Sequence, residues 1–423
     1  MSQVAREMQR QNFQIPLMIG GATTSRAHTA LKIEPHYKAA TVWVKDASRA
    51  VGVAQSLVSK ELVKDFIAKI RIEYAEVRER HRDRGPGKQL VPLAKARGQR
   101  FSCDWDAYTP PTPKQPGITV FESYDLGELR NYIDWMPFFN AWELAGRFPA
   151  ILDDEIVGVQ ARELYADAQR MLDQLIAERW LTAKGVIGFW PAASNGDDID
   201  VYAAEAAPKA KPIASLRHLR QQVEKPADRP DFCLADFIAP KGNAAKADAV
   251  RDWVGGFAVT AGIGIDVHVA RFEADHDDYS SIMLKALADR LAEAFAERLH
   301  ERVRKEFWGY QPDETLPNED LIAEKYVGIR PAPGYPACPE HTEKGILFEL
   351  LSAPEHTTLQ LTEGYAMYPT AAVSGWYFSH PQSQYFVVGK VSRDQVEDYA
   401  KRKSWTREVA ERWLAPYLGY EPE

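Results

Sequence analysis

Residues 278–307, DYSSIMLKALADRLAEAFAERLHERVRKEF, decide the fold class of the larger part of the chain. Their apolar side chains recur at the spacing of one helical face: Met283, Leu287, Leu291, Phe295, Leu299 and Val303. The last turns carry Arg302, Arg304 and Lys305, which suit the negative end of a helix dipole. Together these features predict one long helix with an apolar stripe.

Strands and further helices flank this helix in the sequence. Residues 185–202, GVIGFWPAASNGDDIDVY, predict two strands joined by an Asn-Gly turn, and GGFAVTAG at 255–262 predicts a buried strand. Residues 375–391 predict a hairpin around 381–383, and Ser392 with Gln395 then matches the capping box that opens a helix. A helical stripe also runs through 155–179. Strands separated by helices, with hairpins, predict an α+β unit over residues 118–423.

The first 80 residues follow a different pattern, in which strands and helices alternate. Short apolar strands at 15–19 and 41–44 are each followed by small or polar residues and a helix, and a charged helix covers about 61–80. This order predicts a doubly wound parallel α/β fold. A sheet of only two parallel strands leaves its edges and faces uncovered. We therefore expect residues 1–80 to form a partial, loosely packed domain.

The composition changes between these two regions. Residues 81–117 are rich in Gly and Pro and end in YTPPTPKQPG, which has four prolines in ten residues. Proline restricts φ and removes an N–H donor, which favours extended chain over a helix or strand. Residues 81–117 are therefore predicted to be a linker.

The composition also limits the class of partner. The 423 residues carry a net charge of −8, whereas nucleic acids and anionic membranes attract basic proteins. No apolar run approaches the ~20 residues that a membrane helix needs, and the N-terminus lacks the apolar stretch of a signal peptide. The three cysteines lie far apart, and the histidines form no metal-binding motif. We expect a cytoplasmic protein with reduced thiols, no zinc site, and neither nucleic acid nor membrane as a partner.

Two loops in the first region occupy ligand-binding positions of an open sheet. Gly20-Gly21 follows the first strand, and Ala47 lies in the loop after the second. Small residues there let a ligand approach a helix N-terminus closely. The sequence contains neither G-x-G-x-x-G nor a P-loop lysine, so a plain tight turn is the alternative interpretation.

The segment RPAPGYPACPEH at 330–341 is the most unusual in the chain. Four prolines and a glycine exclude regular helix and central strand, so the segment is predicted to be a stiff loop. It would hold Arg330 and Tyr335 in fixed directions, and an arginine fork can bind a carboxylate with two hydrogen bonds. A small zwitterionic ligand fits this pattern, and a surface loop with a structural ion pair is the alternative.

Three other places hold candidate residues. Asp134 lies among aromatic residues in NYIDWMPFF, where an acid caps a helix or binds a cation. Tyr385-Phe386 would form either an aromatic wall or part of the core. His268, in Asp266-Val-His268, is interpreted as structural because Arg271 stands where a D-x-H-x-x-G motif needs glycine.

Together these motifs resemble the C-terminal portion of cobalamin-dependent methionine synthase. IPLMIGGATTSRAHTA and VKDASRAVGV are similar to the last two strand-loop-helix units of that family's cobalamin-binding domain. NYIDWMPFF, residues 276–305, GIRPAPGYPACPEHTEK and SGWYFSHPQSQYF are similar to its S-adenosylmethionine-dependent activation domain. The resemblance implies an α/β remnant of a doubly wound cobalamin-binding domain, followed by an α+β activation domain that binds S-adenosylmethionine.

The resemblance also implies a function. In this family a methyl group passes from methyltetrahydrofolate to homocysteine through cobalamin, which occasionally oxidises to cob(II)alamin. The activation domain then regenerates methylcobalamin with S-adenosylmethionine and an electron from a flavodoxin-type donor. The chain would thus be a methyltransferase of methionine biosynthesis, with a cobalamin-binding domain or chain as its partner.

The resemblance assigns roles to individual residues. Arg330 would hold the ligand carboxylate, and Asp134 would lie near its amino group. Ala332 and Gly334 would make backbone contacts, Tyr385-Phe386 would flank the adenosyl group, and Tyr335 would approach the corrin. Glu293 and Glu324 are placed near the site, and Gly20, Gly21 and Ala47 would face cobalamin. No general acid or base is expected, because a cobalt nucleophile needs mainly orientation and a suitable charge environment.

Departures from the family leave alternatives open. The D-x-H-x-x-G motif that carries the lower cobalt ligand is absent, so the cobalamin site is incomplete. The folate domain and the homocysteine domain, which holds the family's zinc, are also missing. The chain would be a fragment, a truncated product or one subunit of a split enzyme. A non-catalytic docking module and an unrelated small-molecule methyltransferase are the other hypotheses.

Overall fold

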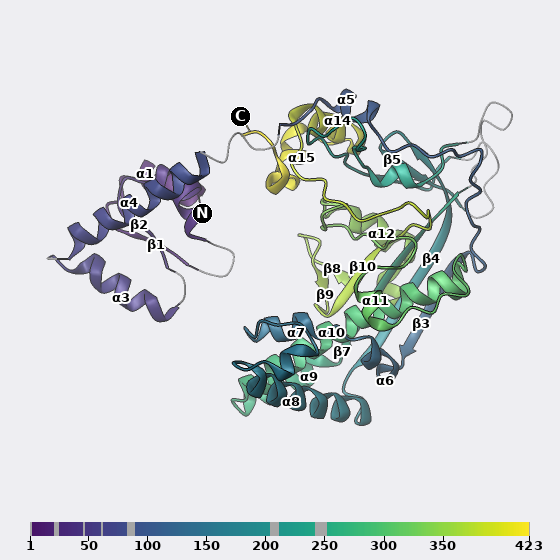
Figure 1. Ribbon diagram of the computed structural model, residues 1–423, viewed down its shortest axis with the longest axis horizontal. Helices are drawn as coiled ribbons and strands as arrows, with labels where there is room; N and C mark the ends of the chain where they lie inside the picture. Colours follow the sequence, from purple (N-terminus) through teal and green to yellow (C-terminus); the bar gives the residue numbers. More distant parts are fainter. Residues whose placement is uncertain are drawn as a thin grey trace. The chain divides into compact units, whose positions relative to one another are not determined.

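The computed structural model describes residues 2–20, 25–44, 47–60, 62–82, 89–203, 211–241 and 252–422. The chain divides into two compact units, Met1–Gln89 (unit 1) and Leu90–Glu423 (unit 2). Figure 1 shows both, coloured along the sequence. No helix among the described residues is both long enough and apolar enough to cross a membrane.

Unit 1 is built around two short parallel strands. Its elements are α1 (Ser2–Arg10), β1 (Leu17–Ile19), α2 (Arg26–His28), β2 (Thr41–Trp43), α3 (Ala47–Val58) and α4 (Val63–Arg82). Strand β1 pairs with β2 in parallel, as the alternating pattern predicts. Ser25 accepts a hydrogen bond from the backbone N–H of His28 and so caps α2.

Small apolar clusters hold unit 1 together. Ile19 and Tyr37 are buried in one cluster, and Tyr74 is buried in another. The Tyr74 hydroxyl accepts the Trp43 N–H at 2.8 Å, which fixes α4 against β2. These contacts order the two strands and their helices, and the assignment of unit 1 to a cobalamin-binding domain stays a prediction.

Unit 2 contains a larger antiparallel sheet. Its strands are β3 (Gly117–Tyr124), β4 (Thr182–Asn195), β5 (Asp198–Val201), β6 (Ala214–Arg217), β7 (Asp252–Ile263) and β10 (Ala372–Tyr377). The order is β10-β7-β4-β5-β6, and β3 pairs with the first half of β4. A separate short pair is formed by β8 (Gln360–Leu361) and β9 (Met367–Tyr368). The predicted turn between β4 and β5 and the predicted buried strand β7 are confirmed.

Helices complete unit 2. They are α5 (Leu93–Gly98), α6 (Leu126–Leu129), α7 (Met136–Ala141), α8 (Gly158–Ala177), α9 (Ile265–Ala274), α10 (Asp278–Arg302), α11 (Asn318–Ile322), α12 (Glu343–Leu351), α13 (Ala353–Thr357), α14 (Arg393–Lys403) and α15 (Arg407–Trp413). The long helix predicted over 278–307 is confirmed, because α10 continues into a π-helical turn at Val303–Phe307.

The central strands are buried on both faces, since alternate side chains of a strand point to opposite sides. On β4, Ile187 and Phe189 pack in the cluster that contains the apolar stripe of α10. Val186 and Trp190 pack in the cluster that contains Leu347 of α12. Unit 2 therefore has the predicted α+β fold, and its sheet lies between two helical layers. Helices α7 to α10 gather on one side of it in Figure 1.

Three local predictions are wrong. Residues 90–117, expected within the linker 81–117, belong to unit 2: Leu90 bridges to Val223, and the Trp308 indole donates to the Pro111 carbonyl. The predicted hairpin at 375–391 is a single strand, β10, followed by irregular chain, because β10 pairs with β7 instead.

The predicted capping box at the start of α14 is also absent. Helix α14 does begin after Ser392, but the Ser392 side chain makes no cap hydrogen bond. The Gln395 side chain is buried and exchanges hydrogen bonds with the backbone of Arg220 instead. The local sequence pattern predicts that Gln395 caps the helix, but its side chain makes tertiary hydrogen bonds with Arg220 instead.

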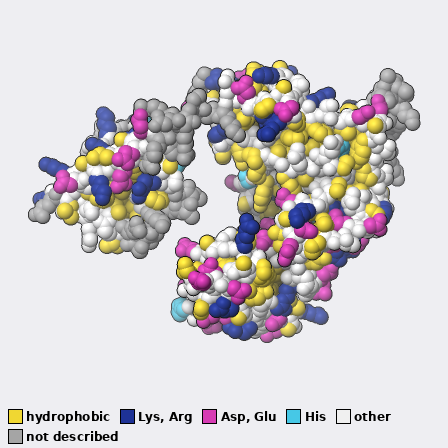
Figure 2. Space-filling model, viewed as in Figure 1, with side chains coloured by type: hydrophobic (Ala, Val, Ile, Leu, Met, Phe, Trp, Pro, Cys, Tyr) yellow, Lys and Arg dark blue, Asp and Glu magenta, His cyan; other side chains and the backbone are white. Residues whose placement is uncertain are grey.

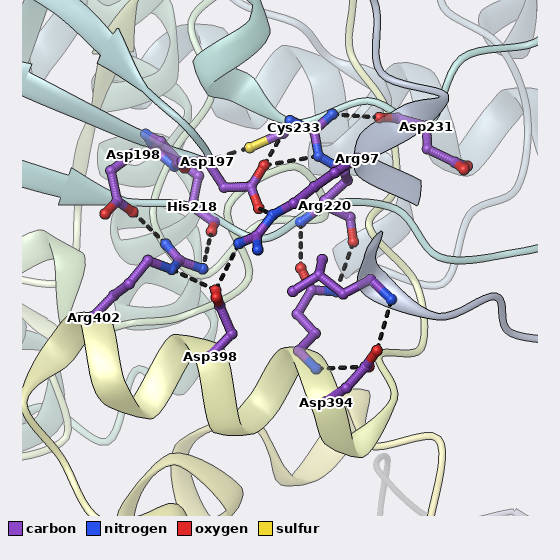
Figure 3. A network of polar contacts seen from close by, with 12 residues as sticks. Arg97, Asp197, Asp198, His218, Arg220, Asp231, Cys233, Asp394, Asp398 and Arg402 are labelled. Carbon is purple, nitrogen blue, oxygen red and sulfur yellow. Dashed lines mark hydrogen bonds and ion pairs between the residues drawn. The ribbon is translucent and has the colours of Figure 1, made fainter. Parts of the chain in front are cut away.

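A buried network of charged groups joins distant segments of unit 2 (Figure 3). Arg220 is 1% exposed and pairs with Asp197 at 2.6 Å and Asp236 at 2.7 Å. Arg97 of α5 bridges Asp197 to Asp398 of α14, with contacts of 2.7 and 2.8 Å. The network therefore ties the beginning and the end of unit 2 to the β4–β5 turn.

Candidate functional site

One cavity in unit 2 gathers most of the residues that the sequence singles out. Its volume is about 400 Å³, within the range of small-molecule sites. It is lined by Phe257, Glu293, Glu324, Arg330, Pro331, Ala332, Tyr335, Pro336, Ala337, Val373, Tyr385, Phe386 and Val387. Two acids and one arginine thus face a largely apolar and aromatic wall.

Several elements of the fold meet at this cavity. The sheet supplies Phe257 from β7 and Val373 from β10, and helix α10 supplies Glu293. The loop that follows α11 carries Glu324, and the chain after β10 carries Tyr385. On the face of unit 2 seen in Figure 2, apolar side chains gather over its central part, and charged side chains of both signs are mixed over α8 and α9. The site thus depends on the complete fold of unit 2.

The proline-rich segment 330–337 is held in place by backbone hydrogen bonds. The Pro331 carbonyl accepts from Trp376 N at 2.8 Å, and the Pro336 carbonyl accepts from Val388 N at 2.9 Å. Gly334 has φ +94° and donates its N–H to the Cys338 carbonyl at 2.7 Å. A Cβ at Gly334 would lie 2.5 Å from the His341 ring. The predicted stiff loop is therefore confirmed, with glycine required at this turn.

Arg330 is anchored from behind the cavity. Its Nη1 and Nη2 atoms donate to the two Glu297 carboxylate oxygens at 3.3 and 2.7 Å. Nη1 also donates to the Tyr326 hydroxyl at 2.7 Å and lies 3.3 Å from His300 Nδ1. Burial works to lower the pKa of Arg330, but Glu297 and two tyrosines outweigh it, and the pKa is raised. Arg330 is therefore fully charged at neutral pH.

Tyr385 links the aromatic wall to the arginine loop. Its hydroxyl accepts the Arg330 backbone N–H at 3.0 Å and lies 3.1 Å from the Tyr326 hydroxyl. Burial raises the pKa of Tyr385, although Arg330 works against it, so the phenol is protonated. The wall and the guanidinium are thus fixed relative to each other.

The acids and the exposed aromatic residue lie around the cavity. Desolvation raises the pKa of Glu324, and the opposing effect of the nearby Arg330 charge is smaller, so the pKa is raised. Glu324 also adopts a left-handed φ of +57°, uncommon for a residue other than glycine. Tyr335 is 60% exposed at the cavity. Two acids and an exposed aromatic ring at this cavity suit a cationic ligand that must reach a partner.

Other predicted residues are not brought to the cavity. Asp134 does not line it, and its carboxylate accepts the Met136 N–H at 3.0 Å just before α7. The N-cap of α7 is Trp135, which makes no side-chain cap hydrogen bond, so the structure shows neither the helix cap nor the cation contact named above for Asp134. Gly334 shapes the loop without lining the cavity. In unit 1, Gly20 follows β1 and Ala47 begins α3, whereas Gly21 lies outside the described residues.

Sequence reasoning missed the residues that hold Arg330. Glu297 and His300 lie on α10, and both they and Tyr326 are buried. A signal exists for Glu297, because it follows Glu293 by four residues and so occupies the same helix face. Nothing in the local sequence of His300 or Tyr326 indicates a contact with residue 330.

His268, a further chemical candidate in the sequence, has structural surroundings. His268 lies on α9 and stacks on Trp180, with 4.5 Å between ring centroids. Among the described residues, no group of three or more His, Cys, Asp or Glu is arranged to hold a metal ion. The cavity beside Arg330 is therefore the candidate site.

Comparison with known proteins agrees with this geometry. Residues 125–404 match the family described as vitamin B12 dependent methionine synthase, activation domain. The chain belongs to this family. The matched residues include the whole lining of the cavity, whereas Gly20, Gly21 and Ala47 lie outside the match.

A solved structure supports the same activation-domain assignment. It is described as the crystal structure of the MetH reactivation domain bound to AdoHcy. That chain is 55% identical to this one, with a TM-score of 0.74, and the alignment covers 78% of this chain and 99% of the other. The resemblance inferred from the sequence is therefore confirmed for the activation domain.

Proposed function

We propose that unit 2 binds S-adenosylmethionine in the Arg330 cavity and donates its methyl group in the reactivation of cob(II)alamin. The observation that carries the proposal is a charged arginine, anchored from behind, at a cavity with two acids and an aromatic wall. The related MetH domain is described as bound to AdoHcy, which is S-adenosylmethionine without its methyl group.

The ligand has a place for each of its parts. Arg330 would bind the carboxylate, because a guanidinium fork matches a carboxylate with two hydrogen bonds. Tyr385 and Phe386 would flank the adenosyl group, with Ala332 and the turn at Gly334 making backbone contacts. Glu293 and Glu324 would face the positive sulfonium.

Asp134 remains a proposed partner of the ligand amino group. In the structure its carboxylate holds the Met136 N–H. A carboxylate has further lone pairs, so this contact leaves it able to accept from an ammonium group. Its role therefore requires α7 to lie near the bound amino acid.

The proposed chemistry is methyl transfer with an electron supplied from outside. The sulfonium carbon–sulfur bond breaks, the methyl group passes to cobalt, and S-adenosylhomocysteine remains in the cavity. One electron from a flavodoxin-type donor balances the reduction of cob(II)alamin. The residues of this chain orient the donor and surround its charge, and none has to move a proton.

Cobalamin, when bound, supplies the cobalt nucleophile, and Tyr335 at the exposed end of the cavity would contact it. Gly20, Gly21 and Ala47 are proposed to face cobalamin in unit 1, as the end of a cobalamin-binding domain. The chain has one D-x-H sequence, at Asp266 to His268, and it lies in α9 of unit 2. We therefore propose that the lower cobalt ligand comes from a cobalamin-binding domain or chain that partners this one.

Isothermal titration of the full chain with S-adenosylmethionine tests the proposal. We expect one site, with an affinity that falls by about 100-fold in Arg330→Ala, since a buried charged pair with the ligand is lost. Asp266→Ala, on α9, is the control, and its affinity should equal that of the parent. Absence of heat with the parent chain, or equal binding by Arg330→Ala, would instead favour the docking module that binds no nucleotide.

A further inference from the structure

The guanidinium of Arg330 has one edge bound by protein and one edge free. Arginine carries five N–H donors. Two of them, one on Nη1 and one on Nη2, point to Glu297, and the other Nη1 donor points to Tyr326. The Nε–H and the second Nη2–H have no partner among the described residues. These two N–H groups lie parallel on the same edge, which is the arrangement that binds a carboxylate side-on.

Burial indicates where each edge points. Arg330 lines the cavity with 18% of its side chain exposed. Its partners Glu297, His300 and Tyr326 do not line the cavity, and at most 8% of each is exposed. The edge that Glu297 holds therefore faces the protein, and the free edge faces the cavity.

Glu297 fixes this orientation more firmly than the other partners. It grips the fork through both carboxylate oxygens, whereas Tyr326 and His300 each contact only Nη1. Helix α10 carries Glu297 in the layer packed against the sheet, so its position follows from the core. An arginine without such a partner samples many rotamers, and their loss on binding weakens affinity.

We propose that Glu297 is a positioning residue, which turns the Nε–Nη2 edge of Arg330 into the cavity and so makes the site select ligands that carry a carboxylate. This inference rests on the proposed function and adds to it the residue that sets carboxylate specificity. Tyr326 assists, because its hydroxyl accepts the other N–H of Nη1.

The test compares two ligands that differ only in the carboxylate, S-adenosylmethionine and decarboxylated S-adenosylmethionine. Both are titrated into the full chain and into Glu297→Gln, in which one acceptor oxygen becomes an amide that cannot accept from arginine. We expect affinity for S-adenosylmethionine to fall by about tenfold and affinity for the decarboxylated ligand to change by less than about twofold.

Glu301→Gln is the matched control. Glu301 lies one turn further along α10, is 8% exposed and pairs with Arg298 and Lys305, away from the cavity lining. Its substitution should leave the ratio of the two affinities unchanged. If Glu297→Gln fails to fold, Tyr326→Phe decides, and we expect it to lower the same ratio by about threefold.

The possible outcomes distinguish a failure of the role of Glu297 from a failure of S-adenosylmethionine binding itself. Equal weakening of both ligands by Glu297→Gln would show a merely structural role and overturn the inference, as would an unchanged affinity for S-adenosylmethionine. In either case the proposed function would stand, because the parent chain binds. A parent chain that binds neither ligand would overturn the proposed function and this inference with it.

Discussion

Arg330 shows how a buried charge can serve a ligand without destabilising the protein. Removing a guanidinium from water is costly unless its donors are satisfied. Glu297 supplies a matching charge and Tyr326 a further acceptor, and the remaining edge meets the cavity. The same contacts that make the residue tolerable in the core therefore orient it for binding.

Glu324 is expected to distinguish a sulfonium from a neutral thioether. It lines the cavity, and an acid there attracts a positive ligand more strongly than an uncharged one. In Glu324→Gln, affinity for S-adenosylmethionine should fall by about fivefold, whereas affinity for S-adenosylhomocysteine should stay within about twofold. Titration calorimetry with both ligands measures the difference. Equal losses for the two ligands would show that Glu324 does not sense the sulfonium charge.

At the scale of elements, the loop at 330–337 depends on one glycine. Gly334 combines a positive φ with a position where a Cβ would meet the His341 ring. In Gly334→Ala we expect a loss of unfolding free energy of about 1 to 3 kcal/mol, from the strained backbone and the overlap. Urea unfolding measures this loss.

The same substitution should also weaken ligand binding, because Arg330 and Ala332 belong to the loop that Gly334 turns. Gly364→Ala is the control, since φ there is not in the left-handed range and a Cβ would meet open space. Gly334→Ala with the stability and affinity of the parent would contradict the role of this turn.

The sequence predicted elements more completely than their partners. Helical periods located α8 and α10, because burial of one face leaves a repeating pattern. Strands β4 and β7 were located by an apolar run before an Asn-Gly turn and by a buried run of small and apolar residues. The irregular loop at 330–341 could also be predicted, since proline and glycine set the backbone conformation locally. Its ligand-facing residues could be listed from the family resemblance.

Contacts between distant segments could not be predicted from the sequence. Gln395 is bound by Arg220, 175 residues away, so its capping-box pattern gave the wrong hydrogen bond. The segment 90–117 is rich in proline, yet it packs on unit 2 through Leu90 and Pro111. Glu297 and Tyr326 escaped notice for the same reason, because their importance comes from contact with Arg330 across the fold.

At the scale of the molecule, the network of Figure 3 is expected to stabilise unit 2 as a whole. Burial would raise the pKa of Asp197, but Arg220 and Arg97 outweigh it, and the pKa is lowered. Breaking a buried pair leaves an unpaired charge, so Asp197→Asn should lower the free energy of unfolding by about 3 kcal/mol or more.

Asp398→Asn is the matched control, because Asp398 lies at the more exposed end of the same network, with 28% of its side chain exposed. Its substitution should lower the free energy of unfolding by less than about 1 kcal/mol. Urea unfolding of both variants gives the comparison. Equal losses of unfolding free energy in the two variants would show that burial of Asp197 does not increase its contribution to stability.

Acid should destabilise the protein through His218. This residue is 1% exposed, and burial, followed by the charge of Arg402, lowers its pKa to about 3. The unfolded chain takes up a proton near pH 6.5 while the folded chain does not, so the free energy of unfolding falls as the pH drops from about 6.5 toward 3. The slope contributed by one such histidine is at most about 1.4 kcal/mol per pH unit.

Urea unfolding at several pH values between 4.5 and 7 measures this slope. His218→Gln removes the titrating group. The slope of the free energy of unfolding against pH should then be shallower by up to about 1.4 kcal/mol per pH unit, the value for one proton. His276→Gln is the control substitution, because the His276 side chain is exposed. A slope that is the same in His218→Gln and the parent would contradict the assignment.

The most direct test of the account is a crystal structure of the full chain with S-adenosylhomocysteine. We predict that its carboxylate lies within hydrogen-bonding distance of Arg330 Nε and Nη2, with Glu297 still on the opposite edge and the adenosyl group beside Tyr385 and Phe386. A ligand bound elsewhere in the molecule, or bound with its carboxylate away from Arg330, would contradict it.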